Sequence, residues 1–294
     1  MHLRNPFVLR SFSLSPIQVR LRGPRIRLLS ALAGLISVTF GGCTMVRTQL
    51  AYDDHPSGAA IQVREVALDT YLYAQLAQNA YSENEFKLPS YVTELEPADT
   101  PGTNTPDTGF AVRTYWVRPP ERKPYVVVAF RGTQFTSVPD WKYGNMTDRQ
   151  YEQGLEHVKR IRKKVPAGTP IIVTGHSLGG AIATSVSLNE ENIRAYGFDA
   201  SLRLRRGRAV SNWREYVSQH GEILAGLRAI VRNPYGRYTV INCPGLSGRP
   251  SERHDMRLLA ACLTRIAAWE DKTADWSREE NHLGPKERIL RSPR

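Results

Sequence analysis

Ser177 stands between a strand-like run and a helix-like run, in a setting that suits a nucleophile. The apolar, β-branched residues 171–173 precede it and the small residues 181–184 follow it. This pattern predicts a buried parallel strand, a sharp turn and a helix. Gly175 and Gly179 flank the serine, where side chains would collide with the neighbouring strand and helix. The helix N-terminus would offer free N–H groups and a partial positive charge to a developing oxyanion.

A serine hydroxyl becomes a useful nucleophile only when a base takes its proton and an acid orients that base. In α/β-hydrolases the chain order is serine, acid, histidine. His254 lies in a Gly/Pro/Ser loop after the last expected strand and just before a helix, whereas His220 comes too early for a base. Asp199 ends one expected strand and Glu222 follows the next, so both carboxylates fit the required order. The residues alone leave the acid open.

An oxyanion hole needs two N–H donors. Leu178, directly after the nucleophile, supplies the first. Thr133 ends the segment Arg131-Gly132-Thr133 after an earlier strand and supplies the second, with Gly132 letting the backbone approach closely. A simple turn is the alternative interpretation of that segment.

The elements that must position these residues alternate along the chain, which favours an α/β fold with a mainly parallel central sheet flanked by helices. Residues 84–109 and 273–294 are polar without periodicity and read as a surface loop and a loosely held tail. The folded domain is therefore expected over residues 65–272. We expect helices at 66–81, 148–164, just after Ser177 and at 256–269, an antiparallel strand pair at 110–117 and 125–130, and further strands at 171–175, 193–198, 215–217 and 238–243.

Residues 1–42 have the features of a signal peptide. They carry six arginines and no acidic residue, and an apolar core at 28–40 is too short for the ~20 residues that span a bilayer. Gly41-Gly42-Cys43 resembles a bacterial lipobox, which implies lipidation of Cys43. Thr44 after the cysteine implies sorting to the outer membrane, facing the periplasm. Residues 43–64 would then form a tether. Ordinary secretion or a short anchor is the alternative.

Three cysteines are an odd number for an exported chain. If Cys43 carries lipid, Cys243 and Cys262 remain as a pair in an oxidising compartment. They lie on either side of His254 in the sequence, and either a disulfide or two buried thiols fits the pattern.

The net charge of +12 suggests nucleic-acid binding until it is located, because half of the excess lies in residues 1–42. No zinc-ligand spacing, phosphate-binding loop or aromatic-basic repeat accompanies the charge. We therefore expect no nucleic-acid partner, no metal and no cofactor.

Three segments together resemble the class 3 (fungal-type) lipase family: residues 129–133, Asp140-Trp141 and residues 173–180. The resemblance runs from about residue 66 to residue 269. It implies Ser177 as nucleophile, His254 as base, and Thr133 and Leu178 at the oxyanion hole. The family's acid segment is similar to residues 217–224, with Glu for Asp, and this favours Glu222 over Asp199.

The chain departs from that family in one informative way. Only 43 residues lie between Thr133 and Ser177, fewer than a full lid helix and an extra strand require, which favours ester hydrolysis over interfacial lipolysis. The sequence thus predicts a serine hydrolase that cleaves carboxylic esters of acyl lipids. An acyltransferase, thioesterase or peptidase with the same nucleophile, or a non-catalytic envelope lipoprotein, is the alternative. The oligomeric state is not indicated.

Overall fold

The computed structural model describes residues 45–46, 55–96, 104–105, 108–132, 144–202, 211–226, 236–243 and 249–286. All of them belong to the unit that spans residues 43–294, and the separate unit of residues 1–42 lies outside the described chain. The elements in chain order are β1 (Met45–Val46), α1 (Ile61–Asn79), β2 (Val92–Glu96), β3 (Asn104–Thr105), β4 (Phe110–Val117), β5 (Tyr125–Phe130), α2 (Gly144–Lys164), β6 (Ile171–His176), α3 (Leu178–Asn189), β7 (Ile193–Phe198), β8 (Arg214–Gln219), β9 (Arg237–Ile241), a 3₁₀ helix (Glu252–His254), α5 (Met256–Ala267) and α6 (Lys272–Glu280).

One twisted sheet runs through this unit in the strand order β1-β9-β8-β7-β6-β5-β4-β2, and β3 pairs with β4. The strands from β1 to β5 in that order are parallel, whereas β2, β3 and β4 pair antiparallel. The expected α/β class with a mainly parallel central sheet is therefore confirmed. Strand β6, which ends directly before Ser177, lies near the middle, so its carboxyl end is flanked by the carboxyl ends of β5 and β7.

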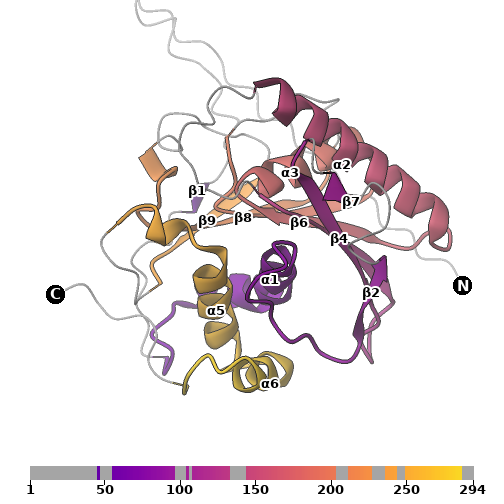
Figure 1. Ribbon diagram of the computed structural model, residues 1–294. Coiled ribbons are helices and arrows are strands. Elements are labelled where there is room, and N and C mark those ends of the chain that lie inside the picture. The colour runs from indigo at the N-terminus through magenta and orange to yellow at the C-terminus, as the bar shows by residue number, and fades with distance from the viewer. Residues whose placement is uncertain are drawn as a thin grey trace, which may run out of the picture. The chain divides into compact units, whose positions relative to one another are not determined.

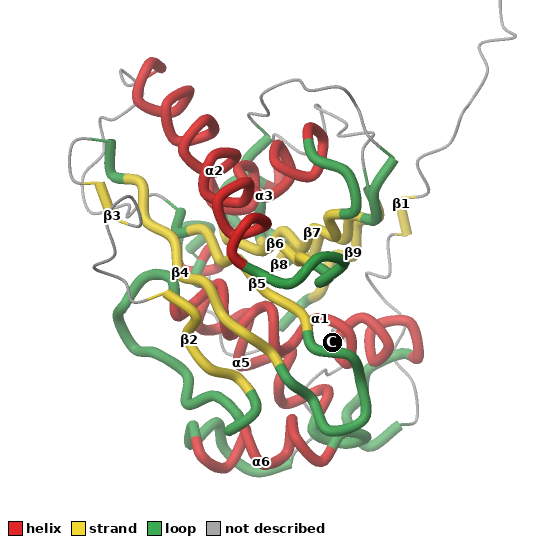
Figure 2. Tube along the Cα trace, turned by 90° about the vertical axis from the view of Figure 1, so that its right-hand side faces the viewer, coloured by secondary structure: helices red, strands yellow, loops and turns green. Residues whose placement is uncertain are grey.

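Helices cover both faces of the sheet. In Figure 1, α2 and α3 lie on one side and α1, α5 and α6 on the other, and Figure 2 shows the same layering after a 90° turn. Alternate residues of β5 point to opposite faces, as a strand requires. Val126 and Val128 pack with the α2/α3 core, whereas Val127 and Ala129 pack with the α1/α5 core. This two-sided burial explains why the parallel strands appear as unbroken apolar runs.

The expected tether is wrong at its domain end. Helix α1 begins at Ile61 rather than at residue 66, and Ser57, Ala59 and Ala60 just before it are buried. Small side chains let this segment lie against the domain, and Ala59 belongs to the α1/α5 core. Residues Met45–Val46 also pair with β9. The folded unit therefore starts well before residue 65.

The expected surface loop at 84–109 is also partly wrong. Strand β2 pairs with β4 from Val92 opposite Val117 to Glu96 opposite Thr114, with a register shift between Glu94 and Glu96. An edge strand needs only one buried face, and the irregularity interrupts its alternation, so its sequence signal is weak.

The tail expected at 273–294 contains helix α6. The Asp271 side chain accepts a hydrogen bond from the Ala274 N–H at 2.7 Å and caps the first turn. Ala274 and Ser277 are buried, and Gln75 of α1 donates to the Ser277 hydroxyl at 2.9 Å. The helix buries small residues rather than a large apolar stripe, which is why no periodicity is visible in its sequence.

None of the helices in the described part of the chain is both long and apolar enough to span a bilayer.

Candidate active site

Ser177 occupies a strained turn between β6 and α3. Its backbone angles, φ 54° and ψ −123°, lie in a region that non-glycine residues rarely adopt. The surrounding structure holds it there, because the Ser177 N–H donates to the Phe198 carbonyl at 3.0 Å and the Ser177 carbonyl accepts from the Ser201 N–H at 2.9 Å. Ser177 is consequently held, buried, at the carboxyl end of β6.

The two flanking glycines are required by close backbone contacts. A Cβ atom on Gly175 would collide with the backbone of Gly179, and one on Gly179 would collide with the backbone of Phe130. The elbow is therefore packed so tightly against β5 that only hydrogen fits at these positions.

His254 and Glu222 form a buried pair beside this turn. His254 Nδ1 lies 2.7 Å from Glu222 Oε2, and both side chains are almost fully inaccessible to solvent. The Leu224 N–H also donates to Glu222 Oε2 at 2.8 Å, which fixes the carboxylate. The two residues come from the segments that follow β8 and β9. The carboxylate that follows β8 thus contacts the histidine ring that the sequence suggests as base.

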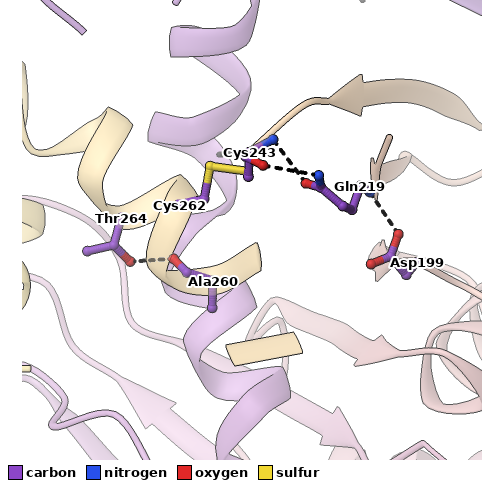
Figure 3. Close-up of a disulfide and its surroundings, with 6 residues drawn as sticks. All are labelled: Asp199, Gln219, Cys243, Ala260, Cys262 and Thr264. Carbon is purple, nitrogen blue, oxygen red and sulfur yellow. Dashed lines mark hydrogen bonds between the residues drawn. A yellow bond between two sulfur atoms is a disulfide. The ribbon is translucent and has the colours of Figure 1, made fainter. Parts of the chain in front are cut away.

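Asp199, the other candidate acid, is fully buried at the end of β7. Its Oδ1 accepts a hydrogen bond from the Gln219 N–H at 2.8 Å (Figure 3). One Asp199 oxygen and one ring nitrogen each of His254 and His176 lie within 4.8 Å of one another. Asp199 therefore belongs to the same buried cluster, while the short contact to His254 Nδ1 is made by Glu222.

His176 lies directly before the nucleophile and faces inward. Its ring centroid is 4.5 Å from that of His254, and its Nδ1 is 2.8 Å from the hydroxyl of Tyr81. Burial raises the pKa of the Tyr81 phenol above its ordinary value, so the hydroxyl stays neutral and acts only through hydrogen bonds. Nothing in the sequence pointed to a role for Tyr81 in the site, because it was expected only as the last residue of the amphipathic helix at 66–81.

The oxyanion side of the site is described in part. Leu178 is the first residue of α3, so its N–H lies at the helix N-terminus. Thr133 lies outside the described residues, but Gly132 directly before it is buried against the elbow. A Cβ atom there would lie 3.1 Å from Ser177 Cβ and 2.5 Å from the His176 carbonyl oxygen. The chain entering Thr133 therefore passes next to the nucleophile.

A disulfide joins Cys243, just after β9, to Cys262 in α5 (Figure 3). It closes the stretch of chain that carries His254. Inside that loop a 3₁₀ helix ends at His254, and Asp255 caps α5 by accepting from the Leu258 N–H at 2.9 Å. Gln219 ties this region to the sheet through two hydrogen bonds with the Cys243 backbone. The loop is thus held at both ends. Cys43, the expected lipidation site, lies outside the described residues.

Comparison with known proteins identifies a family that this chain matches. The model of the Tle-like phospholipase domain matches residues 72–228. Among solved structures, lipase II from Rhizopus niveus matches with 17% identity and a TM-score of 0.37, covering 57% of this chain and 76% of its own. A protein from Xanthomonas campestris pv. campestris, described as a hydrolase of the alpha/beta superfamily, matches with 19% identity and a TM-score of 0.26, covering 38% and 67%. Comparison with curated proteins gave no match.

Proposed function

Because the chain belongs to the family of the Tle-like phospholipase domain, whose model covers just over half of it, we propose that it cleaves carboxylic ester bonds of acyl lipids through an acyl-enzyme on Ser177. That it is a lipase-type α/β-hydrolase follows from the family. The serine mechanism and the acyl-lipid substrate are the proposal.

The observation that carries the mechanism is the buried contact between His254 Nδ1 and Glu222 Oε2 at 2.7 Å. A carboxylate in this position holds the imidazole with its proton on Nδ1, which leaves Nε2 to take the proton of the serine hydroxyl. Glu222 would also stabilise the imidazolium that forms. Desolvation strengthens this interaction, since both side chains are buried.

In the proposed cycle Ser177 attacks the ester carbonyl carbon while His254 takes its proton. The oxyanion is stabilised by the Leu178 N–H at the start of α3 and by the Thr133 N–H. The alcohol leaves with the proton from His254. Water then attacks the acyl-enzyme while His254 takes a proton from it, and His254 returns that proton to the Ser177 oxygen as the carboxylic acid leaves. The rigid elbow keeps the serine in the geometry that both steps need.

Labelling with a fluorophosphonate probe, together with hydrolysis of p-nitrophenyl esters of graded chain length, tests this proposal. Ser177→Ala should abolish both signals. Ser185→Ala removes a buried serine hydroxyl from α3, the helix that follows Ser177, and should keep both signals. Labelling retained in Ser177→Ala would refute the assigned nucleophile. Product analysis with and without added alcohol separates hydrolysis from acyl transfer, and a wild-type protein that reacts with no ester or probe would favour a non-catalytic lipoprotein.

We further propose that Cys43 is lipidated and anchors the enzyme to the outer membrane on the periplasmic side. The Arg-rich, acid-free residues 1–42 and the Gly-Gly-Cys that ends at residue 43 support this placement, as does a disulfide typical of exported proteins. Metabolic labelling with palmitate should mark the wild type and not Cys43→Ser. Label retained in Cys43→Ser, or absent from the wild type, would overturn the anchor.

A further inference from the structure

Three side chains from separate segments meet beside the nucleophile in a way that the serine mechanism does not need. His176 ends β6, Asp199 follows β7, and His254 comes from the loop after β9. One potential ligand atom of each lies within 4.8 Å of the others, and all three residues are buried. In the proposed mechanism only His254 of this group has a task.

Each of the three side chains is oriented by a hydrogen bond at one of its polar atoms. His254 Nδ1 contacts Glu222 at 2.7 Å, His176 Nδ1 contacts the Tyr81 hydroxyl at 2.8 Å, and Asp199 Oδ1 accepts from the Gln219 N–H at 2.8 Å. Metal-ligating histidines are held in this manner, with one ring nitrogen bonded to a carboxylate or another oxygen and the second directed at the ion. By the same geometry, we take Nε2 of each ring, the nitrogen opposite these contacts, as the candidate ligand.

The chemistry of the donors selects the ion. Two imidazole nitrogens and one carboxylate oxygen suit divalent transition metals, among which Zn²⁺ has no redox chemistry of its own, whereas Mg²⁺ and Ca²⁺ prefer oxygen ligands alone. Ligand atoms around tetrahedral zinc lie about 3.4 Å apart, so side-chain movements of about 1 Å would close the cluster. Water or the Ser177 hydroxyl would take the fourth position.

We propose that His176, Asp199 and His254 form a zinc-binding site that switches the hydrolase off. Zinc occupies the lone pair on His254 Nε2, which is the atom that would accept the proton of Ser177. A bound ion therefore removes the base without unfolding the site. Zinc binding requires only the three ligands. Inhibition by zinc rests, in addition, on the proposed function.

Cobalt(II) reports on such a site because its tetrahedral complexes absorb strongly in the visible range. We expect full-length Ser177→Ala protein, which cannot turn over ester, to bind one Co²⁺ per chain with this spectrum and to lose it when Zn²⁺ is added. Adding His176→Ala should weaken binding by more than the roughly 10–100-fold that removal of an outer partner costs, and Tyr81→Phe by roughly tenfold. His282→Asn, at an exposed position outside the cluster, should bind like the parent.

Absence of a tetrahedral Co²⁺ spectrum, or a spectrum and affinity unchanged by His176→Ala, would overturn the site. His176→Asn provides a second variant if the alanine protein does not fold, judged by circular dichroism. In chains with Ser177 intact, Zn²⁺ should inhibit ester turnover, and His176→Ala should raise the inhibitory zinc concentration by at least about tenfold. If the wild-type chain bound cobalt but showed no ester turnover, the site would be retained and the proposed function refuted. Wild-type turnover that saturating zinc leaves unchanged would refute the switch.

Discussion

Glu222 Oε2 lies 2.7 Å from His254 Nδ1, although the two residues come from loops that follow different strands. The same oxygen accepts the Leu224 N–H at 2.8 Å, so the carboxylate is oriented before any substrate binds. Asp199, the nearest rival, uses its Oδ1 for the Gln219 N–H at the end of β8. The two carboxylates therefore have separate tasks: Glu222 orients the ring of His254, and Asp199 ties β7 to β8.

This division predicts unequal effects of two matched substitutions. Glu222→Gln keeps the size of the side chain but stops favouring the tautomer with its proton on Nδ1, and we expect kcat to fall by roughly 10³–10⁴-fold, as for loss of a triad acid. Asp199→Asn, which can still accept from the Gln219 N–H, should lower kcat far less. Steady-state kinetics on a soluble p-nitrophenyl ester measures both, and a larger loss in Asp199→Asn would reassign the acid.

The disulfide between Cys243 and Cys262 should stabilise the loop that carries His254. The two cysteines are 19 residues apart, and closing a loop of this size stabilises the folded state by ~3 kcal/mol in the chain-entropy model. We expect Cys243→Ser with Cys262→Ser to unfold at a correspondingly lower urea concentration than the wild type.

Wild-type protein reduced with dithiothreitol is the control, because it loses the cross-link without losing any sulfur atom from the core. Equal unfolding midpoints for the oxidised and reduced wild type would show that the cross-link contributes no stability.

The sequence defined the central strands because burial on both faces leaves unbroken apolar runs, such as 171–173 in β6. It also predicted the turn at Ser177, because a strand, a glycine-flanked serine and a helix form one local pattern. The sequence did not predict edge strand β2 or helix α6, because both bury few large side chains and their hydrophobic patterns are therefore weak.

The choice between Glu222 and Asp199 depended on the reach of two side chains from adjacent strand ends, which no local pattern encodes. The cluster of His176, Asp199 and His254 is likewise a tertiary feature. Its members are far apart in sequence and lack metal-ligand spacing. The parallel register of β6 and β7 places His176 beside Asp199, and the segment after β9 brings His254 to them.

Glu215 gives the stability a pH dependence at the opposite end of β8. Burial raises the pKa of its carboxyl to about 7, and nearby Asp69 adds to the rise while Arg237 opposes it. The folded state therefore holds this proton more tightly than the unfolded state. The contribution of the protonated Glu215 carboxyl to the free energy of unfolding is fully present below pH about 4.5 and is lost as pH rises through about 7.

Glu215→Gln should remove this pH dependence. Compared with wild type, the free energy of unfolding of the variant should be higher at pH 8 by on the order of 2 kcal/mol more than at pH 4.5. Urea unfolding at the two pH values, in wild type and variant, measures the difference. Parallel pH profiles for the two proteins would contradict the assignment.

Gly132 should be intolerant of a methyl group because it lies between the turn at Ser177 and the Tyr81 side chain. A Cβ atom there would lie 2.5 Å from both the His176 carbonyl oxygen and the Tyr81 hydroxyl. Relief requires the backbone before Thr133 to move, and with it the proposed oxyanion donor. We expect Gly132→Ala to lower kcat by roughly 10²–10³-fold, the usual effect of losing one such donor.

The same substitution should destabilise the fold by roughly 1–3 kcal/mol through overpacking, so activity and thermal unfolding are measured together. Gly226→Ala is the matched control, because a Cβ atom at that position meets nothing within 4 Å. If Gly132→Ala unfolded at a lower temperature yet kept full kcat at 20 °C, the segment entering Thr133 would be structural and the second oxyanion donor would have to come from another part of the chain.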